Sequence, residues 1–90
     1  MRIALICHDK PDALQVRLDT RTAHLAHIEA SGVVEMAGPF LNPEGRMTGS
    51  LIILQVETLQ AAQDWAAADP YAQAGLFESV TLSEWKKVIG

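Results

Sequence analysis

The sequence has one cysteine, no excess of basic residues and no long hydrophobic run, and each absence excludes a class of protein. Cys7 alone cannot form an intramolecular disulfide or a cysteine zinc finger, so we expect a cytoplasmic protein. Seven Lys and Arg against eleven Asp and Glu leave a net charge of −4, which argues against nucleic-acid binding. The apolar runs at residues 3–7 and 51–54 are too short for a signal sequence or a membrane span.

Glycine and proline are also scarce, with six and four residues, while 49% of the chain is hydrophobic and 20% is charged. This composition excludes disordered, collagen-like and low-complexity chains. Ninety residues without a repeat or a linker predict a single domain over residues 1–90. A domain of this size buries only roughly 60–65% of its unfolded surface, and self-association would bury more.

Hydrophobic patterning predicts four strands. They cover residues 3–7, 33–40, 49–56 and 76–82. The first is a continuous apolar run, which is typical of a central strand buried on both faces. Pro39 restricts the second strand to a sheet edge, because proline cannot donate to a strand ladder. The turn signal at residues 42–45 joins the second and third strands in a hairpin.

Two helices are predicted between these strands. Residues 13–31 carry an apolar stripe at helical spacing, which we expect to face the core. The stripe consists of Leu14, Leu18, Thr22, Leu25 and Ile28. The second helix runs from residue 59 to about residue 68, with Thr58 as its N-cap. It stops at Asp69-Pro70, and residues 71–75 form a loop or a single turn.

The order β-α-β-β-α-β is the ferredoxin-like arrangement, an α+β fold with two helices on one face of an antiparallel sheet. The third strand is apolar on both sides, so the open sheet face would expose an apolar patch. We therefore expect a homodimer in which two open sheet faces pack together.

His24 and Asp69 are the leading candidates for chemistry. His24 flanks the predicted buried stripe, and histidine is the side chain most easily tuned for proton transfer at neutral pH. Asp69 ends the second helix, which lies beside the first in this fold and can bring its carboxylate to His24. A carboxylate there would fix the tautomer of the imidazole and support its charged form. The alternatives are a packing histidine and an ordinary turn aspartate.

The remaining histidines and the cysteine have plainer interpretations. His24 and His27 are three residues apart on a helix, but no third ligand is near, so we expect no metal site. His27 is expected to be a solvated surface residue and His8 an exposed strand-end residue. Cys7 is expected in the core, and no nucleophile, phosphate-loop or dinucleotide motif is present.

Four further residues are candidates for ligand binding. Ser50 begins the third strand and can donate to a substrate or an anion, or it is simply a strand-start hydroxyl. Arg17 and Arg21 flank the helix stripe, where they attract a carboxylate-bearing ligand or are merely solvated. The backbone near Gly38 is a further candidate for positioning a substrate.

Several of these segments together resemble the YciI-like family, also called the YCII-related domain. They are Arg21-Thr22-Ala23-His24-Leu25, Gly32, Ala37-Gly38-Pro39, Gly49-Ser50, Asp69-Pro70-Tyr71 and Ala74-Gly75-Leu76. The resemblance covers nearly the whole chain. It departs at Ser83-Glu84-Trp85, where the family often has a basic residue and a proline before an aromatic.

The resemblance implies a dimeric α+β barrel with an active site on His24 and Asp69. Some relatives act on hydroxylated or chlorinated aromatic rings, mostly without a metal or an organic cofactor. We therefore expect an acid–base enzyme acting on a small polar or aromatic substrate by proton transfer, isomerisation or elimination. Two alternatives remain: a non-catalytic module that binds a small anion, and a structural dimer in which His24 and Asp69 join the helices.

Overall fold

A computed structural model describes residues 1–90, and its elements follow the predicted order with one short helix added. The elements are β1 (Arg2–Asp9), α1 (Leu14–Ser31), β2 (Val34–Leu41), β3 (Met47–Gln55), α2 (Leu59–Ala68), α3 (Pro70–Gln73) and β4 (Phe77–Trp85). The single turn expected after Asp69 is α3. The last strand ends at Trp85 rather than at residue 82.

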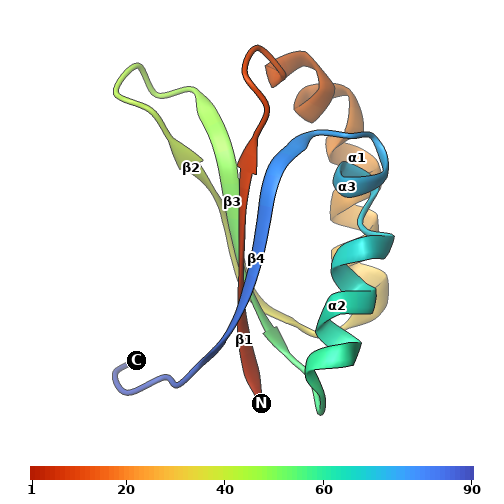
Figure 1. Ribbon diagram of the computed structural model, residues 1–90, viewed down its shortest axis with the longest axis vertical. Coiled ribbons are helices and arrows are strands. Elements are labelled where there is room, and N and C mark those ends of the chain that lie inside the picture. The colour runs from red at the N-terminus through yellow and green to blue at the C-terminus, as the bar shows by residue number, and fades with distance from the viewer.

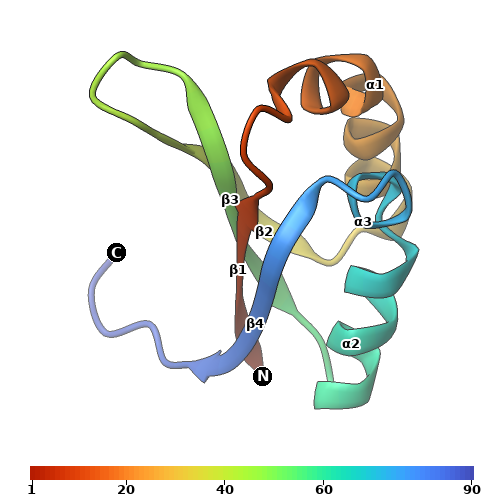
Figure 2. The same ribbon diagram turned by 45° about the horizontal axis from the view of Figure 1, so that its top comes forward.

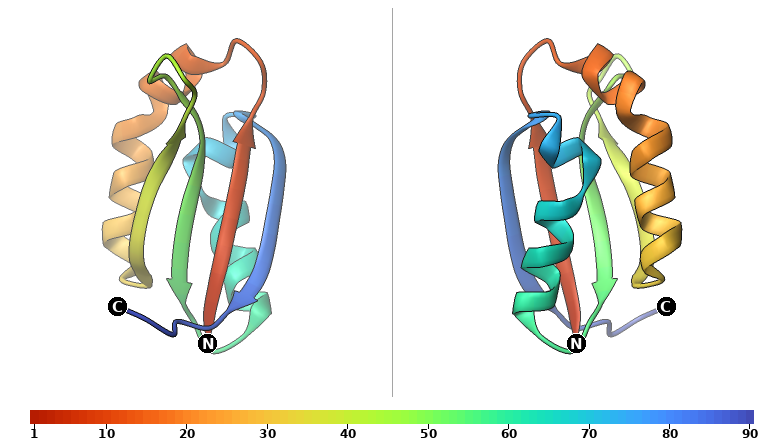
Figure 3. Two further views of the ribbon diagram at one scale, coloured as in Figure 1. Left: turned by 90° about the vertical axis from the view of Figure 1, so that its left-hand side faces the viewer. Right: turned by 90° about the vertical axis from the view of Figure 1, so that its right-hand side faces the viewer.

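The strands form one antiparallel sheet in the order β2-β3-β1-β4. The helices all cover one face and leave the other open (Figure 1; Figure 3). The predicted central strand is internal, and β2 lies at an edge, as Pro39 predicts. The predicted fold class, α+β with the ferredoxin-like order, is confirmed.

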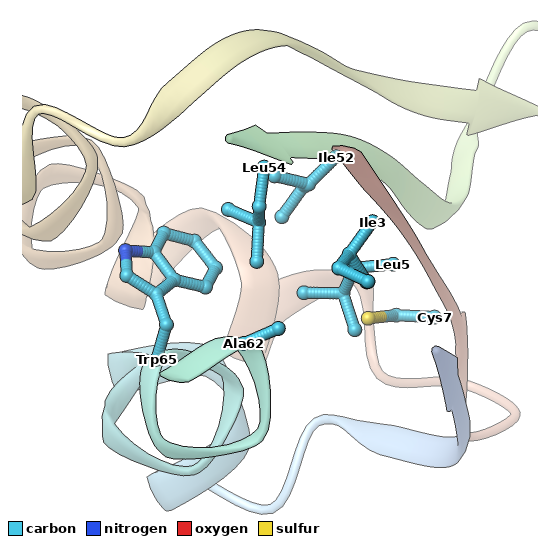
Figure 4. Close-up of a cluster of buried hydrophobic side chains, with 7 residues drawn as sticks. All are labelled: Ile3, Leu5, Cys7, Ile52, Leu54, Ala62 and Trp65. Carbon is cyan, nitrogen blue, oxygen red and sulfur yellow. The ribbon is translucent and has the colours of Figure 1, made fainter. Parts of the chain in front are cut away.

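The core lies between the sheet and α2 (Figure 4). Strand side chains alternate between the two faces, so every second residue of β1 and β3 points to the helices. The buried cluster consists of Ile3, Leu5 and Cys7 from β1, Ile52 and Leu54 from β3, and Ala62 and Trp65 from α2. Trp65 also ties α2 to α1, because its indole N–H donates to Ser31 Oγ at 2.9 Å.

Helix α1 turns a polar side toward the sheet, and the predicted apolar stripe is wrong. Leu18 and Leu25 are 47% and 48% exposed. The buried residues of α1 are instead Arg17 and His24. Ile28 alone of the stripe packs against the core cluster. The reason is that a pocket, rather than packed core, separates much of α1 from the sheet, so polar side chains face inward there.

The open face of the sheet is apolar along its two central strands. Ala4 pairs with Ile53 and Ile6 pairs with Leu51, and directly paired residues share a face. Met36 on β2 adds to this face and is half exposed. Ala4 and Ile53 are already buried in the single chain, so the accessible part of this apolar surface consists of Ile6, Leu51 and Met36.

The chain leaves the sheet after β4 and ends in a short tail near the N-terminal end of β1 (Figure 2). Val88 and Ile89 in this tail are the most exposed of the large hydrophobic residues. No helix of the protein is both long enough and apolar enough to cross a membrane.

Candidate active site

His24 and Asp69 meet where α1 passes the junction between α2 and α3. The His24 Nδ1 atom lies 2.8 Å from Asp69 Oδ1, and both side chains are buried. Asp69 is held there because it caps α3, its Oδ1 also accepting the Tyr71 N–H at 2.9 Å. Pro70, at the first position of α3, fixes the direction of the chain after the cap.

The contact with Asp69 assigns the proton on the His24 ring. A carboxylate oxygen only accepts hydrogen bonds, so the Nδ1–H donates to Asp69 and Nε2 keeps its lone pair. His24 lines a pocket, and Nε2 is the ring nitrogen left free to act there. An imidazole arranged in this way can accept a proton while the carboxylate stabilises the resulting charge.

Tyr71 is a site residue that the sequence reasoning missed. Its ring stacks on His24 with centroids 3.9 Å apart and an interplanar angle of 16°. The Arg17 guanidinium carbon lies 4.8 Å from the Tyr71 ring centroid. Burial raises the pKa of Tyr71, so its hydroxyl keeps its proton at neutral pH. The pair Asp69-Pro70 could have indicated its position, because an Asp cap followed by Pro at the first helical position sets the direction of the residue that follows, Tyr71.

The Arg17 side chain donates hydrogen bonds to two residues of the protein, Asp9 and Ser50. Its Nε and Nη2 donate to the two Asp9 carboxylate oxygens, both at 2.8 Å, and Nη2 also donates to Ser50 Oγ at 3.0 Å. The Arg17 and Asp9 side chains are only 3% and 5% exposed. Burial acts to lower the pKa of Arg17, but the hydrogen bond and charge of Asp9 outweigh it and raise that pKa. The guanidinium therefore stays charged and its charge is balanced.

Asp9 was not a sequence candidate, because no helix or strand spacing connects residue 9 to residue 17 across the loop between β1 and α1. It lies at a register shift between β1 and β4, at the end of the strand. Only the folded loop brings its carboxylate under α1.

A pocket of about 160 Å³ lies between α1 and the β2–β3 half of the sheet. Its polar wall consists of Arg17, Arg21, His24, Ser50 and Tyr71. Its apolar wall consists of Leu25, Ile28, Ala37, Pro39, Met47 and Ile52, with Gly38 beside them. No acidic side chain lines the pocket, and Arg21 forms no ion pair. The pocket rim is therefore positively charged.

The structure gathers all the predicted site residues around this pocket. Arg17, Arg21, His24, Gly38 and Ser50 line it, while Asp69 lies behind His24. At Gly38 an added Cβ would meet no atom within 4 Å, so the small size of the residue is not required for space. A larger hollow of about 340 Å³ between the β1–α1 loop and the β2–β3 hairpin contains no histidine.

The other histidines and Cys7 stand apart from this pocket. His27 Nε2 lies 3.2 Å from the Trp65 carbonyl oxygen and its ring packs on Trp65, so its expected solvated position is wrong. His8 is exposed at the end of β1. Burial, reinforced by the charge of Asp69, raises the pKa of Cys7 to about 12. Its thiol therefore stays protonated, and no three His, Cys, Asp or Glu side chains cluster as metal ligands would.

Comparison with known proteins identifies the family. The model of the YCII-related domain matches residues 1–86. The chain belongs to the YCII-related domain family. Protein YciI of Escherichia coli is 41% identical over 97 residues, which cover 98% of this chain and 99% of the relative. An uncharacterized protein of Haemophilus influenzae is 40% identical over 99 residues, with the same coverage. The family resemblance seen in the sequence is confirmed.

Solved structures agree with this assignment. The YCII-related chain superposes with a TM-score of 0.87 and 33% identity on 5-chloro-2-hydroxyhydroquinone dehydrochlorinase (TftG) of Burkholderia phenoliruptrix, in complex with 2,5-dihydroxybenzoquinone. The alignment covers 96% of this chain and 94% of TftG. An antibiotic biosynthesis monooxygenase has a TM-score of 0.61 at 11% identity, which shows a shared fold and nothing more.

Proposed function

We propose that this YCII-related protein is a small-molecule enzyme in which His24 transfers a proton and Asp69 orients and supports it. The observation that carries the proposal is the buried hydrogen bond between His24 Nδ1 and Asp69 Oδ1 beside the pocket. It leaves Nε2 as the proton acceptor and places a negative charge where an imidazolium would need it. Tyr71 stacks on the ring and restricts its rotation.

The substrate class we propose is a single small ring bearing ionisable oxygens. A cavity of roughly 150 Å³ accommodates a benzene ring, and this pocket has about 160 Å³. Its apolar wall suits the ring faces, and its positively charged rim suits an oxyanion. The similarity to TftG, a dehydrochlorinase whose structure contains 2,5-dihydroxybenzoquinone, supports the same class.

The chemistry that follows is proton transfer, with isomerisation or elimination as its result. For an elimination, His24 Nε2 takes a proton from a ring hydroxyl, that oxygen becomes a carbonyl, and the displaced ring electron pair takes the proton back from Nε2 at the carbon that bears the leaving group. Nε2 then takes a proton from a second ring hydroxyl, whose O–H electron pair drives formation of a second carbonyl, and the leaving group departs with its own bonding pair to give a quinone. The net loss is the leaving group and one proton, which His24 returns to solvent. Arg21, at the pocket rim and free of an acidic partner, would hold the anionic substrate.

We also propose that the protein acts in the cytoplasm as a homodimer formed through the open sheet face. The support is the apolar surface of β1 and β3 around Ile6 and Leu51. Both residues are partly exposed, and accessible apolar surface marks interfaces in small domains. Light scattering of the wild type and of Leu51→Lys tests the dimer. A mass of two chains that falls to one in the variant is expected, and a wild-type mass of one chain contradicts it.

Turnover of 5-chloro-2-hydroxyhydroquinone, followed by chloride release, tests the proposed function. We expect His24→Gln to remove activity, and His27→Gln, a matched change on the same helix outside the pocket, to retain it. Full activity in His24→Gln would disprove the role of His24. Binding of 2,5-dihydroxybenzoquinone with no turnover of any chlorinated or hydroxylated ring would favour a non-catalytic binding module, for which Arg21 and Ser50 suffice.

A further inference from the structure

We infer that Asp9 and Arg17 are positioning residues that aim the hydroxyl of Ser50 at an oxygen of the bound ring. This inference rests on the proposed function, since it names how the same pocket holds its substrate. It gives Ser50 the role of hydrogen-bond donor and gives Arg17 a role through Ser50 rather than direct contact with the ligand.

The direction of the hydrogen bonds leaves the Ser50 O–H without a partner in the protein. Arg17 Nη2 donates to Ser50 Oγ at 3.0 Å, because a guanidinium has donors and no acceptor. Ser50 Oγ therefore acts as an acceptor toward Arg17, and its own O–H proton needs another partner. No acceptor in the protein takes that proton, and Ser50 lines the pocket while being 4% exposed. The only space left for the O–H is the pocket itself.

Arg17 is held rigidly by its contacts with Asp9. Both Asp9 carboxylate oxygens accept from it at 2.8 Å, a bidentate geometry that fixes the plane of the guanidinium. Tyr71 lies against the guanidinium from the side, with 4.8 Å from the Arg17 Cζ to the ring centroid. A guanidinium held in this way keeps the Ser50 O–H from pointing toward Arg17, and it polarises the serine O–H as a donor.

The charge of Arg17 is balanced by Asp9. Removing two charges from water is costly, and an apolar pair of similar volume often serves stability as well. The Asp9–Arg17 pair is almost wholly buried, yet it lies against a pocket where a directed donor is useful. Because Asp9 neutralises Arg17, the anionic substrate is held by the unpaired Arg21 and oriented by Ser50. The Asp9–Arg17–Ser50 series thus parallels Asp69–His24: in each, a buried carboxylate orients the group that faces the substrate.

A double-mutant cycle with 2,5-dihydroxybenzoquinone as the probe tests this inference by calorimetry. We expect Ser50→Ala to weaken binding about ten-fold, the effect of losing a hydrogen bond to a charged oxygen. Arg17→Lys loses the bidentate geometry and should weaken binding by a similar factor. If Arg17 acts through Ser50, the double variant loses about ten-fold rather than a hundred-fold.

The matched control is Arg21→Lys, a change to another arginine of α1 that lines the same pocket without touching Ser50. Its effect should multiply with that of Ser50→Ala. If Arg17→Lys does not fold, Asp9→Asn replaces it in the cycle with the same expectation. If the fold-losses in affinity for Arg17→Lys and Ser50→Ala multiply in the double variant, the positioning role is overturned and the proposed function is untouched. Failure of the wild type to bind the probe would overturn the proposed ring class and this inference together, whereas binding without turnover would overturn only the catalytic proposal.

Discussion

Replacing Asp69 with Asn removes the charge behind His24 while keeping its shape. The Asp69 Oδ1 atom accepts both the His24 Nδ1–H and the Tyr71 N–H, and Oδ2 has no partner. An asparagine can keep its amide oxygen in the Oδ1 position and place its NH₂ group where Oδ2 was. Asp69→Asn in this orientation keeps both hydrogen bonds and the cap of α3, and it buries an NH₂ group that has no acceptor, a cost in stability that thermal unfolding measures separately from kcat.

The magnitude follows from the separation of the charges. A proton on His24 Nε2 places a positive charge roughly 4 Å from the carboxylate, which at an effective dielectric constant of about 20 corresponds to about 4 kcal/mol. Asp69 is 1% exposed, so solvent screens this attraction little. The amide dipole recovers part of it. Each tenfold in rate corresponds to about 1.4 kcal/mol, so we expect kcat to fall about 100-fold to 1000-fold.

The assay is steady-state chloride release with the substrate named above, for the wild type and for Asp69→Asn. Asp69 lies behind His24 rather than in the pocket lining, so KM should change little while kcat falls. Thermal unfolding of both proteins serves as the control for an intact fold. A fall in kcat of less than ten-fold in a folded variant would refute the reasoning that the Asp69 charge supports an imidazolium.

Three further predictions concern the scaffold. Gly49→Ala would place a Cβ 2.3 Å from the Cys7 carbonyl oxygen. We expect the free energy of unfolding to fall by about 3 kcal/mol and Tm to fall by about 15 °C. The control is Gly38→Ala, where the space is open, and an equal effect there would contradict this steric cause. The pKa of Cys7 is raised to about 12 in the folded protein, so above the ordinary thiol pKa only the unfolded chain ionises this thiol. The free energy of unfolding should therefore fall as the pH rises through that range. Denaturant titrations should show a smaller loss of stability at alkaline pH in Cys7→Ala. Thr58→Ala removes the hydroxyl that accepts the Ala61 N–H at 3.0 Å and should cost about 1 kcal/mol in chemical denaturation.

Much of the site was predictable because the residues carry their chemistry in type and position. His24 on a helix and Asp69 at the end of another could be paired once the β-α-β-β-α-β order placed the two helices on one face. The roles of Ser50, Arg17 and Arg21 stay predictions, although all three line the pocket. Asp9 could not be chosen in advance, since its contact with Arg17 depends on where a loop comes to rest. The Asp69-Pro70 cap indicates the direction of Tyr71 but not its contacts with Arg17 and His24, which depend on the packing of α1.

The sequence by itself determined the order of the elements, the edge position of β2 and the points where the helices end. These features follow from local chemistry: side-chain period, the missing N–H of Pro39, and the Asp69-Pro70 cap. Only the tertiary structure decided which side of α1 faces the sheet. Leu18 is apolar, yet it lies outside, and Leu25 is half exposed at the pocket wall. The buried positions go to Arg17 and His24 because Asp9 and Ser50 offer Arg17 buried partners and Asp69 offers one to His24. A buried polar group is stable only when such partners are present, and residues far apart in the chain supply them only after it has folded.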